Sequence, residues 1–281
     1  MKTIRLSPIA LLLSTILVGG PISAFADETR SVITEGEIQF VADEDGELIV
    51  IPPVGPEGGG PDVELEPEIP GTTGPLSIMK AATISFGSQV ISNQDQTYSM
   101  VAELQPLKET GELVPYVSFA QVQDLRGTNA GWDLKVSVSD FKSDTQNNVL
   151  SGAEITFVDS MVRYEGLNQN NAPTGHTKGL KLIPNVGSVS VMTAETGKGA
   201  GSSSIVWGNQ TNLNEQFSSS NVEVVTNNAI QLSVPGSTAK DATSYEAKLT
   251  WELITTPEED VEDGEDGGDD VDNTVVTNRN I

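Results

Sequence analysis

The chain has 281 residues, with 40 acidic and 15 basic side chains, a formal charge of −25, one His and no Cys. A chain of this charge repels nucleic acid and anionic membranes over long range, so neither is an expected partner. The lack of cysteine excludes disulfides, zinc–thiolate sites and Cys nucleophiles.

The first 26 residues have the three parts of a secretory signal peptide. Lys2 and Arg5 form a basic start, an apolar run covers residues 9–18, and the small-x-small sequence AFA occupies 24–26. The apolar run is well short of the roughly 20 residues that a membrane-spanning helix needs. We therefore expect a secreted protein that does not span the membrane and whose mature chain begins near Asp27; an uncleaved anchor is the alternative.

Two acidic segments flank the centre of the chain. Residues 27–70 contain one alternating run, EIQFVAD, and then a stretch rich in Pro, Gly and Glu, which predicts a mostly disordered spacer. Residues 258–281 carry dense negative charge and Gly, which predicts a disordered acidic tail. The tail does not fit the EF-hand calcium frame, because Gly264 falls at a ligand position when Gly267 is taken as the loop glycine.

Residues 71–257 have the texture of a single all-β domain. Short runs rich in Val, Ile, Ser and Thr recur every 8 to 15 residues between Gly, Asn or Asp, beginning near Leu76. This spacing, without a long helical period, predicts a β-sandwich of immunoglobulin-like general architecture. No helix longer than a turn or two is expected.

Two Trp-x-Leu motifs lie in strand-like runs, GWDLKVSVSDF at 131–141 and SYEAKLTWELITTP at 244–257. Side chains two apart share a face of a strand, so Trp132 and Leu134 point to one side, as do Trp251 and Leu253. The residues between them are charged. We interpret both motifs as half-buried strands whose Trp and Leu side chains belong to the core.

The third tryptophan and the single histidine lie in stretches that suggest loops. Trp207 precedes GNQTNLN, a Gly- and Asn-rich stretch, so an exposed ring that stacks on a glycan is one interpretation and a plug at the end of the core is the other. His176 lies in NNAPTGHTKG and is expected to be exposed to solvent.

No catalytic, metal or cofactor site is expected from the motifs. The sequence contains no G-x-S-x-G, H-E-x-x-H or phosphate-binding Gly loop. A glycosidase needs only two carboxylates beside a cleft, for which Asp124 and Asp140 are candidates. The simpler interpretation is that Asp124 and Arg126 organise the turn before the first Trp-x-Leu motif.

The residues around the two motifs resemble the WxL family of bacterial cell-surface proteins. The resemblance covers residues 74–257 and includes GPLSI, ISFGSQVI, VSFAQVQDLRGTNAGWDLKVSVSDF, VWG and LSVPGSTAKDATSYEAKLTWELITTP. It implies a domain that attaches non-covalently to peptidoglycan at the cell surface of a Gram-positive bacterium. It also implies that the two motifs lie near one another and define the wall-binding region, and that a membrane-anchored, WxL-interacting surface protein is a partner.

Three functions from different classes follow. The first is a non-catalytic surface protein held on the wall, the second is an adhesin for host extracellular matrix, and the third is a wall-active hydrolase. Because the chain is strongly acidic, we expect wall binding to depend on short-range contacts. A local cationic patch formed by Lys178, Lys181 and Lys198 is the alternative.

Overall fold

The computed structural model describes residues 35–42, 49–65 and 71–255. The expected signal peptide at 1–26 and acidic tail at 258–281 lie outside the described residues. The chain divides into two compact units, Met1–Phe40 and Val41–Ile281. The described residues of the first unit, 35–40, are exposed and form neither helix nor strand. The second unit holds all the elements described below.

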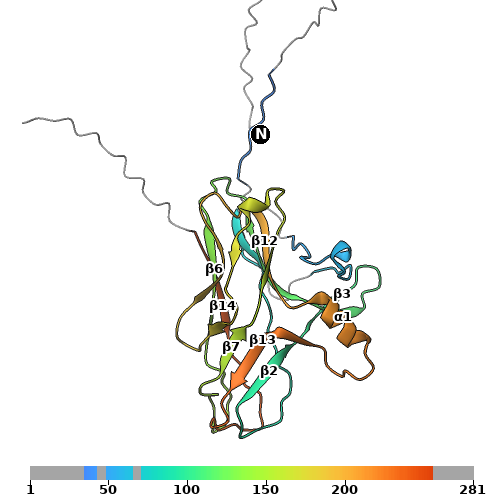
Figure 1. Cartoon of the computed structure of the whole chain (residues 1–281). Helices are drawn as coiled ribbons and strands as arrows, with labels where there is room; N and C mark the ends of the chain where they lie inside the picture. Colours follow the sequence, from blue (N-terminus) through green and yellow to red (C-terminus); the bar gives the residue numbers. More distant parts are fainter. Residues whose placement is uncertain (1–34, 43–48, 66–70, 256–281) are drawn as a thin grey trace, which may run out of the picture. The chain divides into compact units, whose positions relative to one another are not determined.

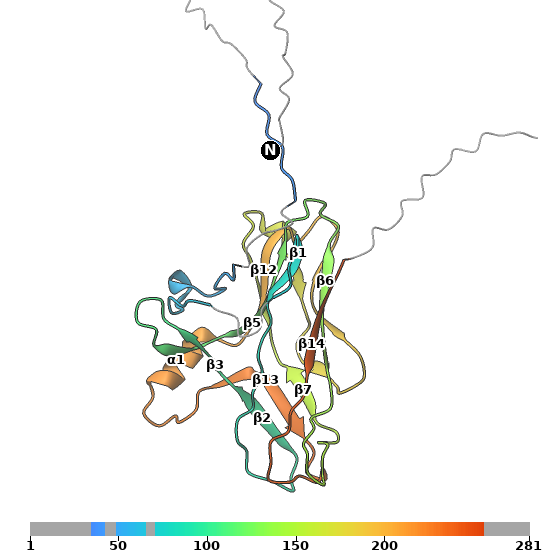
Figure 2. The same ribbon diagram turned by 180° about the vertical axis from the view of Figure 1, so that it is seen from behind.

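Antiparallel strands dominate the described part of the chain, where they form three four-stranded sheets and one two-stranded sheet (Figures 1 and 2). The first sheet has the order β1-β5-β12-β8, with β1 Leu76–Lys80, β5 Ser118–Asp124, β12 Gly201–Trp207 and β8 Met161–Tyr164. The second has the order β10-β7-β13-β2, with β10 Leu180–Leu182, β7 Glu154–Phe157, β13 Thr226–Val234 and β2 Gln96–Val101.

The third sheet has the order β14-β6-β11-β9, with β14 Leu249–Thr255, β6 Trp132–Val138, β11 Val189–Ala194 and β9 Thr174–Gly175. The two-stranded sheet is β3 Glu103–Pro106 with β4 Leu113–Tyr116. The described residues also form three helical segments, which are η1 Pro56–Gly58, η2 Gln169–Asn171 and α1 Gln210–Ser218. The all-β prediction is therefore confirmed.

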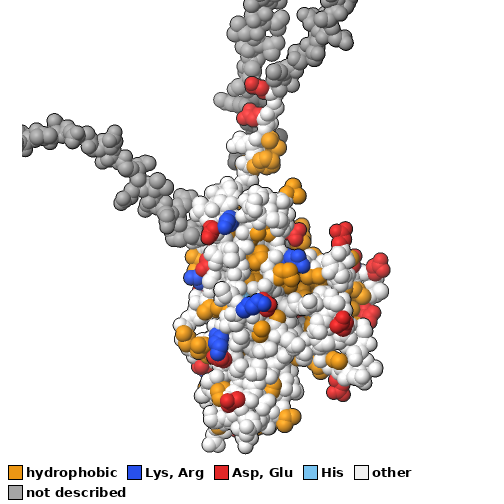
Figure 3. Space-filling view, in the orientation of Figure 1, with side chains coloured by type: hydrophobic (Ala, Val, Ile, Leu, Met, Phe, Trp, Pro, Cys, Tyr) orange, Lys and Arg blue, Asp and Glu red, His pale blue; other side chains and the backbone are white. Residues whose placement is uncertain are grey.

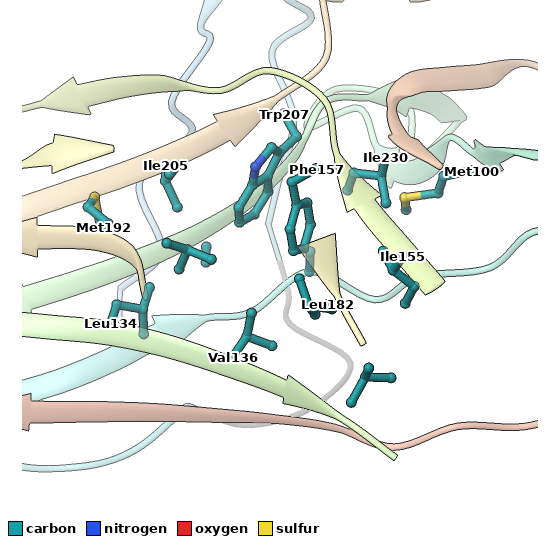
Figure 4. Packing of buried hydrophobic residues seen from close by; sticks show 14 of the residues in the cluster. Met100, Leu134, Val136, Ile155, Phe157, Leu182, Met192, Ile205, Trp207 and Ile230 are labelled. Carbon is teal, nitrogen blue, oxygen red and sulfur yellow. The ribbon is translucent and has the colours of Figure 1, made fainter. Parts of the chain in front are cut away.

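One hydrophobic core joins the three large sheets. Leu134 and Val136 of β6 face Ile205 and Trp207 of β12 across it, and Phe157 of β7 fills the space beside them (Figure 4). Strand β6 alternates strictly between buried and half-buried residues, as expected for a strand with one face on the core. The inner faces of the sheets thus pack together through interdigitated apolar side chains.

Strands β5 and β12 are buried on both faces, because a second apolar cluster covers their outer side. Its buried members are Val54, Val63, Ala102, Tyr116, Val117, Phe119, Val206 and Leu213. Two of them, Val54 and Val63, come from the segment that the composition predicted to be a mostly disordered spacer. Residues 49–65 therefore pack on the sandwich.

The backbone of residues 49–65 is held by side chains of the sandwich. Tyr116 Oη accepts a hydrogen bond from Val54 N–H at 3.0 Å and donates one to Val54 O at 2.9 Å. Gln121 pairs in the same way with Ile51, accepting from its N–H at 2.9 Å and donating to its carbonyl at 2.8 Å. The prediction of disorder is wrong for this segment, because two buried valines and these hydrogen bonds offset the entropy cost of ordering it.

Helix α1 is a second difference from the expectation, since it runs for nine residues through the Asn-rich stretch after Trp207. Asn209 caps it by accepting a hydrogen bond from Asn212 N–H at 3.0 Å. Leu213 anchors it in the second cluster. An Asn-rich sequence taken by itself suggests a loop. Here the N-cap Asn209 and the buried Leu213 stabilise a helix.

Candidate functional site

The two Trp-x-Leu motifs lie on neighbouring strands of one sheet. Strand β14 pairs antiparallel with β6, so that Leu253 is opposite Leu134 and Trp251 is opposite Val136. Figure 1 shows the two strands side by side. The expectation that the motifs lie close together as paired strands is confirmed.

The two motifs differ in burial. Trp132 and Leu134 are 0% exposed, whereas Trp251 and Leu253 are half-buried. The indole N–H of Trp132 donates to Gly199 O at 3.1 Å. Gly199 has φ +77°, and a Cβ there would lie 2.7 Å from Nε1 of Trp132. The first motif is therefore a fully enclosed part of the core, fitted against a glycine that no larger residue can replace without a shift.

An arginine clamp lies at the end of the sheet where the first motif begins. The Arg126 guanidinium donates to both oxygens of Asp124, from Nε at 2.9 Å and from Nη2 at 2.7 Å. It also donates to Gly131 O at 2.9 Å and, from Nη1, to Thr255 Oγ1 at 3.3 Å. The bonds to Asp124 raise the pKa of Arg126 above its ordinary range. This clamp ties β5, the turn before Trp132 and the end of β14 together.

Trp207 is not in a loop. It is the last residue of β12, it is 0% exposed, and its ring stacks on Phe157 with centroids 4.6 Å apart. Its centroid lies 6.0 Å from that of Trp251. Because its ring has no exposed face, Trp207 offers no stacking platform for a glycan in this structure. Of the two interpretations, the plug at the end of the core fits its position.

His176 belongs to the same aromatic cluster and is half-buried rather than freely exposed. Its Nε2 lies 2.9 Å from Trp207 Nε1, which can only donate, and its Nδ1 lies 2.7 Å from Thr177 O. His176 is therefore neutral with its proton on Nδ1. Burial lowers the pKa of His176, although the Thr177 carbonyl and Asp159 oppose this. Nothing in the loop sequence around His176 signals this contact.

The candidate carboxylates have structural partners. Asp124 is 3% exposed and both its oxygens accept hydrogen bonds from Arg126, so it is not free to act as an acid or base. Asp140 is half-buried and lies 3.7 Å from the Lys142 ammonium. Within the described ranges, no group of three or more His, Cys, Asp or Glu side chains could hold a metal ion.

The three lysines considered as a cationic patch are each paired with a carboxylate. Lys178 lies 2.9 Å from Asp159, Lys181 lies 2.5 Å from Glu154, and Lys198 lies 2.6 Å from Glu195. Figure 3 shows basic and acidic side chains next to each other on one face of the molecule. Such pairs leave little net positive charge to attract an anionic polymer.

A groove of about 1070 Å³ opens beside the start of β14. Residues 84–91 form one wall, and residues 240–247 together with Leu249 form the other. Between the walls lie side chains from the second sheet, namely Tyr98, Ile155, Leu232 and Val234. The groove is thus lined largely by apolar and aromatic side chains, and it adjoins the strand that carries the second motif. No pattern in the sequence signals this groove, because its walls are irregular segments that the topology brings together.

The comparison with known families agrees with this architecture. The family described as WxL domain surface cell wall-binding matches residues 27–257, which include both Trp-x-Leu motifs and the packed segment 49–65. No curated protein and no solved structure matches the chain. Among the described residues, no helix is long and apolar enough to cross a membrane. The chain belongs to the family of WxL domain surface cell wall-binding proteins.

Proposed function

We propose that this chain is a non-catalytic surface protein whose WxL domain attaches it non-covalently to peptidoglycan, in a complex with a membrane-anchored surface protein. The observation that carries the proposal is the family match over residues 27–257, since that family binds the cell wall. Export through the signal peptide expected at 1–26 would bring the chain to the surface, and a Gram-positive wall is the surface that the resemblance implies.

The two fully buried tryptophans support wall binding indirectly. Trp132 is fully buried and hydrogen-bonded to Gly199, and Trp207 is enclosed by Phe157 and His176. Neither of these two rings is open to a sugar, and Trp251 of the second motif is half-buried against the core. We therefore assign the motifs to building the sheet, and the contacts with the wall to side chains on the surface that the sheet supports.

The charge distribution favours short-range contacts over electrostatic attraction. The whole chain has a formal charge of −25, and Lys178, Lys181 and Lys198 are already paired with carboxylates. Hydrogen bonds and apolar contacts then supply the affinity, and their strength is largely independent of ionic strength.

A sedimentation experiment tests this proposal. The chain from residue 27 to 281 is incubated with insoluble purified peptidoglycan, and both the retained protein and the soluble fragments released from the wall are measured. Retention without release is expected. Release of fragments would refute the non-catalytic assignment. Failure to sediment alone, with recovery when the membrane-anchored partner is added, would mean that the partner supplies the attachment.

A further inference from the structure

The strand that carries the second motif has an open edge. Within the described residues, β14 has one neighbouring strand, β6. Lys248 O accepts from Ser139 N–H at 2.9 Å, which fixes the phase of the antiparallel ladder. By the alternation of such a ladder, Leu249, Trp251 and Leu253 direct their N–H and C=O groups away from β6. An open edge of this kind is a template for another strand.

The core is also open along this edge. The inward side chains of β14, Leu249, Trp251 and Leu253, are only half-buried. Their counterparts on β6 are buried, with Val136 and Leu134 at 0% exposed. The difference indicates that a layer of apolar contact is lacking on the outer side of β14, where a further strand would lie.

The opposite wall of the groove has few backbone bonds. Residues 83–87 alternate between exposed and half-buried side chains, as an extended strand does. Among the described residues, one backbone hydrogen bond joins the segment 84–91 to a neighbouring strand. In it, Ser85 O accepts from Val101 N–H at 2.8 Å. Val90 lines the groove and is 89% exposed. The groove volume of about 1070 Å³ is slightly larger than that of most small-molecule sites, and each wall is a continuous segment of the chain.

The chain itself carries a segment of matching character. Residues 36–42 have the sequence GEIQFVA, in which Ile38 and Phe40 share one face of an extended strand. Ile38 is 75% exposed, Phe40 is 84% exposed and Val41 is 83% exposed. These exposed apolar side chains would gain stability by packing on a partner surface. The next described residue that packs on the sandwich is Val50, and the chain from residue 42 to it can span at most roughly 28 Å.

We propose that residues 36–42 of a second copy of this chain add as a strand to the open edge of β14, with Ile38 and Phe40 in the groove. The added backbone pairs with β14 from Leu249, where the groove lies, toward Trp251, and the two apolar side chains contact the aromatic and aliphatic lining. Reciprocal exchange of the segment between two copies closes a symmetric dimer. This inference does not depend on wall binding.

Substitution on either partner surface tests the proposal. Mature chain 27–281 is expected to dimerise with increasing concentration in analytical ultracentrifugation. I38E/F40E on the added strand, and V90E in the groove, should each weaken the dimer at least about tenfold. The controls are Val41→Glu and Val186→Glu. Val41 lies on the other face of the added strand, and the side chain of Val186 is 73% exposed and lies outside the groove, so both variants should still form the dimer. All these positions are exposed, and circular dichroism checks that each variant is folded.

Disulfide trapping identifies the pair directly, because the chain has no cysteine of its own. A mixture of Phe40→Cys and Val90→Cys copies should form a crosslinked dimer, whereas Phe40→Cys with Val186→Cys should not. A chain that stays monomeric at all concentrations overturns the proposal, and so does a dimer that survives I38E/F40E. An intramolecular crosslink in the F40C/V90C double variant at high dilution, without dimer, would assign the groove to the same molecule and refute the second copy.

Discussion

The burial difference between the two motifs predicts different costs of truncation. Trp132 is 0% exposed and its removal leaves a cavity beside Gly199, so Trp132→Ala should lower the free energy of unfolding by about 3 to 5 kcal/mol. Trp251 is half-buried on an edge strand, so Trp251→Ala should cost about half as much, roughly 2 kcal/mol. The directly opposed leucines form a second pair in which Leu134→Ala should cost more than Leu253→Ala.

Urea unfolding of chain 27–281, followed by tryptophan fluorescence and circular dichroism, measures these costs, and sedimentation with peptidoglycan is run on the same samples. Loss of retention should track loss of folded protein in every variant. Thr250→Ala serves as a control, because its side chain is exposed on the other face of β14. A Trp132 or Trp251 variant with wild-type stability but without retention would refute the structural role and indicate direct contact with the wall.

Two further predictions concern stability. Burial lowers the pKa of His176 from its ordinary 6.5, so the stability present above pH 6.5 should be lost as pH falls through the folded pKa. The difference in melting temperature between wild type and His176→Gln should change with pH only in that window, and a difference that stays constant with pH would contradict the burial of a neutral His176. At concentrations where the chain is monomeric, deletion of residues 27–48 should leave the melting temperature unchanged. Deletion of 27–65 should destabilise the domain by about 3 kcal/mol through loss of two buried valines, and equal melting temperatures would contradict the packing of 49–65.

Local alternation was sufficient to predict the strand that carries the first motif. The run from Trp132 to Val138 alternates apolar and polar residues, and it forms β6 with the predicted face inward. The turn residues Asp124 and Arg126 also do what the sequence suggested, because their contact is local. Features that depend on residues close together in the sequence could therefore be predicted without a structure.

Features that depend on contacts between residues far apart in the sequence could not be predicted in this way. Composition correctly describes residues 49–65 as rich in Pro and Gly, but it contains no signal for the partners Tyr116 and Gln121, which lie more than 60 residues away. The burial of Trp207 likewise depends on Phe157 and His176, which come from other strands and loops. The groove beside β14 arises in the same way from segments separated by some 150 residues.

The salt dependence of wall retention tests the central claim most directly, namely that the folded domain binds peptidoglycan through short-range contacts. Chain 27–281 and a chain ending at Pro257 are sedimented with purified peptidoglycan at low salt and at roughly 0.5 M sodium chloride, where the Debye length falls to about 4 Å. Retention should stay constant or increase for both chains. A steep fall with salt in both would contradict the account and would mean that a cationic surface drives binding, despite the carboxylate partners of Lys178, Lys181 and Lys198.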